Sequence, residues 1–187
     1  MKDLTRRERL TRSLYKPFRK TIWTPFMAAV LRYGLIREGD TVSLPEETGA
    51  DTVLIGTLLR QLQAHGRTAF RLAEPGEAAD CVAVTGCLSD AAERTVTGLL
   101  REGRLVSLLP MERLGGTRII RPLYRIPREE IDAWAAYNGL PPVPVPEDAR
   151  ASAALLRSLR PVCPDIEKNV FAAVHQVDTD TFPQTEE

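Results

Sequence analysis

The segment from residue 45 to residue 52 carries the first side chains that could do chemistry. Gly49 is typical of a turn, and Asp51 or Thr52 can cap a helix that follows it. A helix that starts after such a turn presents free backbone N–H groups, which are a ready binding site for phosphate. The spacing therefore predicts the frame of a nucleotide-binding loop.

Most of the chemistry that such a loop needs is missing. Phosphate-binding loops normally contain further glycines and a lysine, but this loop has Thr48 and Ala50, with Glu46 and Glu47 beside them. Two like charges about 4 Å apart repel by about 1 kcal/mol in water, and by several times that near a protein surface. We expect the two glutamates to repel a triphosphate.

The first 20 residues form a basic segment, with eight Lys or Arg against two acidic residues. This segment is either a solvated, helical or frayed terminus, or an arm that binds a polyanion such as tRNA. Tyr15, Phe18 and Trp23 are available for packing or for base stacking. Basic runs are weak motifs, so composition alone favours the first interpretation. The candidate tRNA-binding residues are Arg6, Arg7, Arg9, Arg12, Lys16, Arg19 and Lys20.

The whole chain is balanced in charge, with 25 basic and 25 acidic residues among 187, so net charge identifies no partner. Cys81, Cys87 and Cys163 lack metal-ligand spacing and are expected to be small buried hydrophobes in a reducing, cytoplasmic setting. His65 and His175 are expected on helices as surface or packing residues. No apolar run is long enough to predict a membrane span.

Apolar patterning predicts strands that alternate with helices, which is typical of an α/β fold with a parallel sheet. Ligands in such folds sit at the carboxyl ends of the strands, so residues 45–52 and 86–90 are expected at one edge. The expected strands are a short one after Gly39, then 68–72, 81–85 and 118–123. The expected helices are 21–36, one ending at His65, one from residues 89–90 to Gly103, one from Pro127 to residue 138, 148–159 and 165–177. The segment 111–116 is expected to be a loop.

We predict four parts of the chain from these patterns. They are a basic helical leader (1–38), the α/β domain (39–140), a Pro-rich linker with C-terminal helices (141–178) and a loose tail (179–187).

Several short sequence motifs along the chain resemble those of the PP-loop ATP pyrophosphatases of the tRNA 2-thiocytidine synthetase (TtcA-like) family, within the adenine-nucleotide α-hydrolase superfamily. These motifs keep the order that they have in the family, and they lie at residues 19–26, 33–40, 120–124, 128–134, 155–159 and 164–171. The resemblance implies a shortened, Rossmann-like parallel-sheet domain with flanking N- and C-terminal helices.

The family's catalytic motifs are only partly retained in this chain. Against the phosphate loop S-G-G-x-D-S, only Gly49 and Asp51 match, with Thr52 as a conservative replacement. Against G-H-H-x-D-D, residues 85–90 keep only Asp90. The C-x-x-C segment that helps to hold the family's iron–sulfur cluster has no counterpart, so no cluster is expected. The resemblance thus implies a vestigial nucleotide-binding set: Thr48, Gly49, Asp51, Thr52, Gly86 and Asp90.

Three functions stay open on the sequence alone. The first is a non-catalytic paralogue that binds tRNA or a nucleotide, with ATP and magnesium as the implied nucleotide ligands. The second is an active, ATP-dependent tRNA cytidine 2-thiolation enzyme, for which the sequence supplies too few residues. The third is a regulatory protein-interaction module, in a homo-oligomer or paired with an intact homologue.

Overall fold

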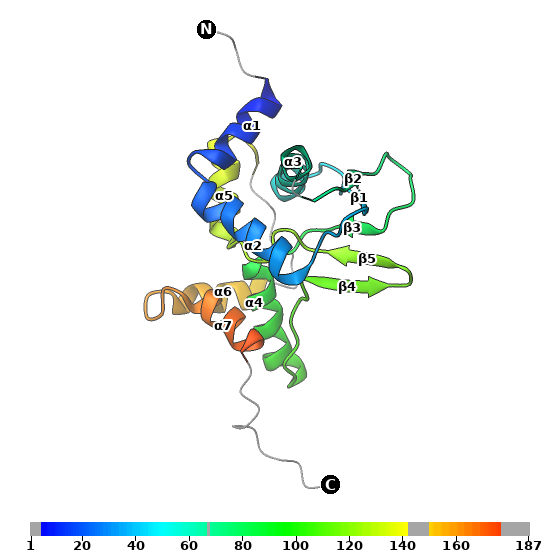
Figure 1. The fold of residues 1–187 in the computed structure, drawn as a ribbon. Coiled ribbons are helices and arrows are strands. Elements are labelled where there is room, and N and C mark those ends of the chain that lie inside the picture. Colours follow the sequence, from blue (N-terminus) through cyan, green and yellow to red (C-terminus); the bar gives the residue numbers. More distant parts are fainter. Residues whose placement is uncertain (1–4, 67, 142–149, 177–187) are drawn as a thin grey trace.

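The computed structural model describes residues 5–66, 68–141 and 150–176. Its sheet has the strand order β2-β1-β3-β5-β4, and the carboxyl ends of β1, β3 and β5 face a layer of helices (Figure 1). The strands are β1 (Thr41–Ser43), β2 (Arg71–Leu72), β3 (Cys81–Ala83), β4 (Met111–Leu114) and β5 (Thr117–Ile120). The helical elements are α1 (Arg6–Tyr15), η1 (Arg19–Trp23), α2 (Thr24–Tyr33), α3 (Ala50–His65), α4 (Leu88–Thr97), η2 (Gly98–Glu102), α5 (Arg128–Tyr137), α6 (Arg150–Leu159) and α7 (Ile166–His175).

The parallel α/β class predicted from the sequence is confirmed, since β1 pairs in parallel with β2 and β3, and β3 pairs in parallel with β5. The connection after β1 leads to β2, toward one edge of the sheet, whereas the connection after β3 leads to β4 and β5, toward the opposite edge. Because parallel crossovers are almost always right-handed, α3 and α4 belong to opposite faces. Their N-termini follow the carboxyl ends of β1 and β3, where the sequence placed the candidate loops.

The prediction of a loop over residues 111–116 was wrong. Residues 111–114 form β4, which pairs antiparallel with β5, and Leu114 lies opposite Thr117. The two residues between them are Gly115 and Gly116, and Gly115 has φ +61. A two-residue hairpin turn needs a positive φ that glycine adopts without strain. The Gly-Gly pair was therefore a hairpin signal.

Helix α1 is not a frayed terminus, because one face of it is buried. Leu14 is fully buried in the main hydrophobic core with residues of α2, α3 and α5. The Ser13 hydroxyl accepts hydrogen bonds from Trp134 Nε1 (2.8 Å) and Asn138 Nδ2 (3.3 Å) of the α5 region. These contacts fix α1 against α5 and leave its charged face outside.

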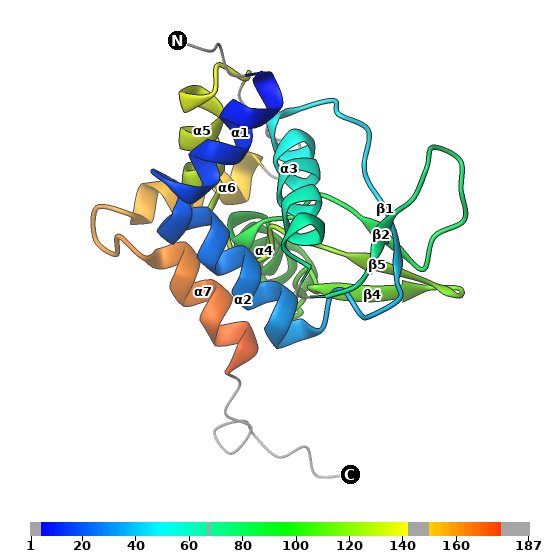
Figure 2. The ribbon, with the colours of Figure 1, turned by 45° about the horizontal axis from the view of Figure 1, so that its top comes forward.

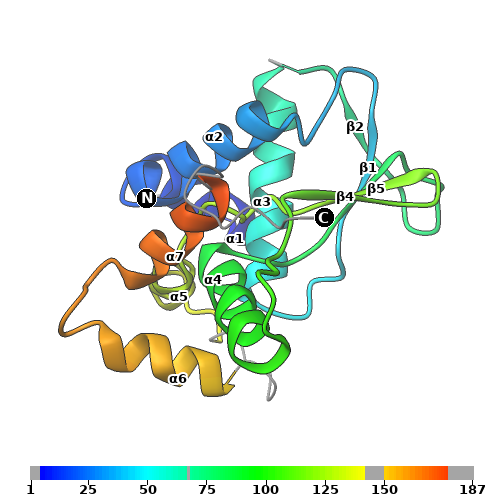
Figure 3. The same ribbon diagram turned by 90° about the horizontal axis from the view of Figure 1, so that it is seen from below.

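The C-terminal helices α6 and α7 pack against α4. Phe171 of α7 is buried with Leu88, Ala91 and Tyr124, and α7 runs beside α2 (Figure 2). Helix α4 lies between α6 and the sheet (Figure 3). Most of the expected linker and the expected tail lie outside the described residues.

A buried ion pair closes the amino end of the sheet. Arg118 at the start of β5 contacts Asp40, which precedes β1, and both side chains are less than one-tenth exposed. Burial alone raises the pKa of Asp40, but the Arg37 backbone N–H and Arg118 outweigh it and hold the pKa below its usual value. This ion pair ties the start of β5 to the residue before β1, and we call this end of the sheet the clamped end.

Candidate functional site

The loop before α3 satisfies its own backbone donors. Thr52 Oγ1 accepts hydrogen bonds from the backbone N–H groups of Thr48 and Gly49, each at 3.1 Å. The Thr52 N–H donates to Asp51 Oδ1 at 2.8 Å. The helix begins at Ala50 with Gly49 as its N-cap, so Thr52 caps from inside the first turn rather than from the cap position. Three donors that could hold a phosphate are therefore already occupied.

Glu47 adds an acidic group at the side of this loop, although it is partly neutralised. Its carboxylate lies 3.2 Å from Arg60 Nη1 of α3, and both side chains are more than one-third exposed. An exposed pair of this kind contributes little to stability. The loop thus offers occupied donors and a nearby carboxylate, which fits a triphosphate poorly.

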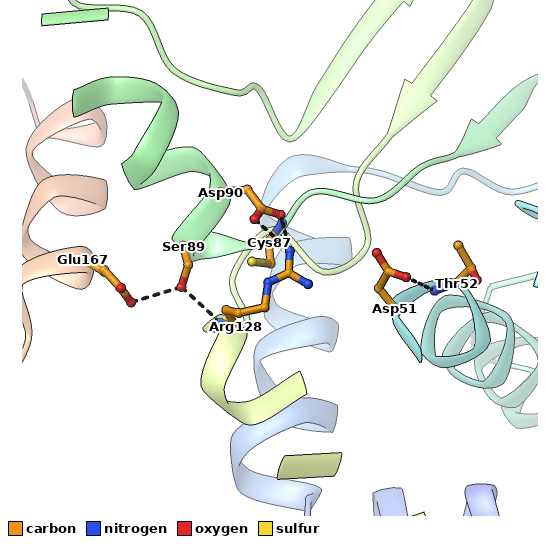
Figure 4. Close-up of polar contacts among 7 residues, drawn as sticks. All are labelled: Asp51, Thr52, Cys87, Ser89, Asp90, Arg128 and Glu167. Carbon is orange, nitrogen blue, oxygen red and sulfur yellow. Dashed lines mark hydrogen bonds and ion pairs between the residues drawn. The ribbon is translucent and has the colours of Figure 1, made fainter. Parts of the chain in front are cut away.

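The second loop, between β3 and α4, is closed by Asp90. Its Oδ2 accepts the Cys87 backbone N–H at 2.8 Å, and both of its oxygens contact Arg128 Nη2 at 2.7 and 2.9 Å (Figure 4). Helix α4 begins at Leu88, so Asp90 lies in the first turn and neither it nor Ser89 is the N-cap. Sequence reasoning did not find Arg128, because only the fold brings the start of α5 to the start of α4.

Gly86 has a steric role in this loop. Its φ is +128, and a Cβ at this position would lie 2.7 Å from Arg121 Cδ. A larger residue would strain the backbone at this φ and would force the Arg121 side chain to move. No described contact links Gly86 to a ligand-binding role, so its place in a nucleotide site stays a prediction.

A polar network extends from Asp90 toward the C-terminal helices. Ser89 Oγ donates to Glu167 at 3.0 Å and accepts the Arg128 backbone N–H at 3.1 Å, as Figure 4 shows. Beside it lies a cleft of about 150 Å³, lined in part by Glu93 and Asp132. Burial, with Asp90 nearby, raises the pKa of Glu93 to about 7, and burial also raises the pKa of Asp132. The charges of this region are only partly paired, because Asp132 Oδ1 and Arg128 Nη1 are buried and have no hydrogen-bond partner among the described residues.

The cysteines do not fit an iron–sulfur cluster. Cys81 lies in β3 beside Asp40 at the clamped end of the sheet, whereas Cys87 lies at the start of α4. Burial raises the pKa of Cys81 to about 11 and raises the pKa of Cys87 as well, so neither is a ready thiolate. Cys163 accepts a hydrogen bond from Asn169 Nδ2. Within the described part of the chain, no group of three or more His, Cys, Asp or Glu residues is arranged to hold a metal ion.

Four of the predicted tRNA-binding residues meet in a groove. The groove lies between α1 and the end of α5, has a volume of about 580 Å³, and includes Tyr137, whose side chain is 64% exposed. We call it the basic groove. Its cationic residues are Arg6, Arg9, Arg12 and Lys16. In residues 5–66, 68–141 and 150–176, no ion pair joins any of the four to a carboxylate.

The other three predicted residues lie elsewhere. Arg7 faces α3 in a separate pocket, Arg19 lines a pocket with Tyr15 and Trp23, and Lys20 is exposed. Phe18 is buried and packs edge-on against Tyr137, with ring centroids 5.5 Å apart. Sequence patterns did not place Tyr137 in the groove, because it is more than 100 residues from α1.

No model of a known protein family matches the sequence, and no curated protein matches it either. Among solved structures, the U34-tRNA thiolase NcsA from Methanococcus maripaludis, with its 4Fe–4S cluster, superposes with a TM-score of 0.55. The two sequences are 11% identical over 81% of this chain and 76% of that one. The chain shares the fold of this thiolase. No described helix is both long and apolar enough to cross a membrane.

Proposed function

We propose that this protein is a non-catalytic, tRNA-binding relative of the tRNA thiolases. The observation that carries the proposal is the basic groove: four cations without carboxylate partners among the described residues, on a fold shared with a tRNA-modifying enzyme. Cations held on a rigid helix can neutralise phosphates and release their counterions, which drives nucleic-acid binding.

The loops at the carboxyl edge support the non-catalytic part of the proposal. ATP-dependent chemistry needs free donors and metal-binding carboxylates around the phosphates. Here Thr52 and Asp51 occupy three donors, and Asp90 is paired with Arg128. The buried cysteines supply no ready thiolate for sulfur transfer. The observations therefore favour binding over thiolation.

The test is tRNA binding at several salt concentrations, measured by fluorescence anisotropy. We expect the variant with Arg6, Arg9, Arg12 and Lys16 all replaced by Ala to bind about 10- to 100-fold more weakly at low salt. The slope of log affinity against log salt should fall by about 3, since each phosphate contact contributes about 0.7 to 0.9.

A charge-matched control separates a specific groove from general attraction. Four exposed arginines outside the groove can be replaced together by Ala: Arg37, Arg101, Arg104 and Arg113. We expect this control to retain most of the affinity. Equal losses in both variants, or no tRNA binding by the wild-type protein, would contradict the proposal. ATP-dependent thiolation of tRNA by the purified protein would contradict its non-catalytic part, and micromolar binding of ATP with magnesium by calorimetry would contradict the interpretation of the loop before α3 as a poor triphosphate site.

A further inference from the structure

A second cavity opens on another side of α1, where four side chains spaced four residues apart form one wall. Residues four apart lie on the same side of a helix, and the path α1–η1–α2 is helical through most of this segment. The cavity has a volume of about 380 Å³, within the range of about 300–1,000 Å³ that is usual for small-ligand sites. We call it the aromatic cup. Its lining residues are Tyr15, Arg19, Trp23 and Met27, with Leu62 and His65 from α3.

Three rings shape the aromatic cup. The ring centroids of Tyr15 and Trp23 are 5.3 Å apart, and each lies 5.5 Å from the His65 ring. The Tyr15 hydroxyl is hydrogen-bonded to His65 Nε2, which ties the wall of α1 to the wall of α3. Burial raises the pKa of Tyr15, so the phenol stays neutral near pH 7. Trp23 is half-buried and also packs against Phe26, with ring centroids 5.5 Å apart, and the rest of its side chain lines the cavity.

The charge around the aromatic cup favours an anion. Arg19 is exposed, and the described residues include no ion pair to it. The lining contains no carboxylate. Lys16, next to Tyr15 in the chain, belongs to the basic groove. The cup and the groove therefore flank the C-terminal end of α1, where one polyanion can contact both.

We propose that the aromatic cup binds one unstacked base of a single-stranded RNA segment, with an adjacent phosphate on Arg19. The proposal rests on the RNA binding proposed above and narrows it to single strands or loops. Stacking on aromatic side chains needs a base that is free of its own stack. A regular duplex presents its backbone and the edges of its bases but no free base face, so it gains no stacking in the cup.

Tryptophan fluorescence tests this proposal directly in the full chain. The chain has two tryptophans. Trp134 is fully buried and donates from Nε1 to Ser13, so a bound base can quench only Trp23. We expect a single-stranded hexanucleotide RNA to quench the emission, and the same sequence in duplex form to leave it unchanged. In Trp23→Phe the oligonucleotide should produce no quenching.

Affinity measurements supply a second readout. Trp23→Ala or Arg19→Ala should weaken binding of the single strand about 10-fold, while duplex binding changes less than 2-fold. Leu31→Ala is the control, because Leu31 is an exposed apolar residue on α2, the helix that follows η1, and we expect it to bind as wild type. Arg19 is exposed, so its variant stays informative if Trp23→Ala does not fold.

The outcomes separate this proposal from the one it rests on. RNA binding that depends on the basic groove, without Trp23 quenching and with no loss in Arg19→Ala, would overturn the aromatic cup and leave the groove intact. Quenching by uridine monophosphate at the same concentration as by the hexanucleotide would show a free-nucleotide site and would also overturn it. If RNA binding did not depend on the four cations of the basic groove, while the hexanucleotide still quenched Trp23, the proposed function would be contradicted instead.

Discussion

The loops at the carboxyl edge of the sheet and the basic groove on α1 differ in how far their polar groups are already used. At the edge, Thr52 and Asp90 each bind backbone donors of their own loop, and Asp90 also binds Arg128. In the groove, cations such as Arg9 and Arg12 have no carboxylate partner among the described residues. A group that is already paired must lose its partner before it binds a ligand, whereas an unpaired cation loses only water and counterions.

This difference makes opposite predictions for stability and for binding. Substitutions at the edge should cost stability, because they leave partners unsatisfied. Substitutions in the groove should cost affinity and little stability.

The largest stability effect is expected for Arg128→Met. The change removes both contacts to Asp90 from a pair whose side chains are only 20% and 26% exposed. Removing one member of a partly buried pair leaves the other uncompensated, so we expect a loss of about 2 kcal/mol in the free energy of unfolding. Urea denaturation measures it.

Arg94→Met is the matched control for Arg128→Met, since Arg94 pairs with Glu102 on the surface of the α4–η2 segment. Exposed pairs contribute about 0–1 kcal/mol. Equal losses in the two variants would show that the Asp90 pair contributes no more to stability than a surface contact does.

A smaller effect is expected for Thr52→Val, which keeps the shape of the side chain and removes its hydroxyl. The backbone donors of Thr48 and Gly49 then lose a hydrogen-bond acceptor. Loss of such a cap costs about 1 kcal/mol, or about 2–4 °C in Tm for a chain of this size. Thr57→Val is the control on the same helix, because Thr57 Oγ1 only donates to the Val53 carbonyl. If Thr52→Val and Thr57→Val had the same Tm, this would contradict the interpretation that Thr52 Oγ1 satisfies the backbone donors of the loop before α3.

The sequence predicts elements that depend on local pattern and misses those that depend on distant partners. The leucines at helical spacing in α3 and the apolar run of β3 were enough to place both elements and to predict the α/β class, which the fold confirms. Arg128 and Tyr137 were not found as site residues, because tertiary packing alone brings α5 to α4 and α1. Tyr15, Arg19, Trp23 and Met27 are spaced four residues apart, but sequence patterns did not identify them as a site, because the second wall of the cavity comes from α3.

The network at the edge should also respond to pH through Glu93. Its pKa rises from 4.5 to about 7 in the folded protein, mainly because of burial. The folded state thus favours the protonated form, and stability falls as pH rises from about 4.5 to about 7. The groups around it are Asp90 and Arg128, with Arg157 and Glu167 from the C-terminal helices.

Glu93→Gln should remove this pH dependence. At pH 8 we expect the variant to be more stable than wild type by on the order of 1 kcal/mol, since solvent screens a half-buried group. At pH 4.5 the two should be nearly equal. Thermal unfolding across this pH range measures the difference, and a gap that is constant with pH would show that Glu93 does not titrate in this window.

The smallest stability effect is expected in the basic groove itself. Replacing Arg6, Arg9, Arg12 and Lys16 by Ala removes four like charges from one side of α1, while the apolar face that carries Leu14 is unchanged. Surface substitutions of this kind each change stability by less than about 0.5 kcal/mol, and relief of repulsion between neighbouring cations acts in the stabilising direction. We therefore expect Tm within about 2 °C of wild type while tRNA affinity falls. A large drop in Tm would mean that these side chains are structural and that the lost affinity reports unfolding rather than a binding groove.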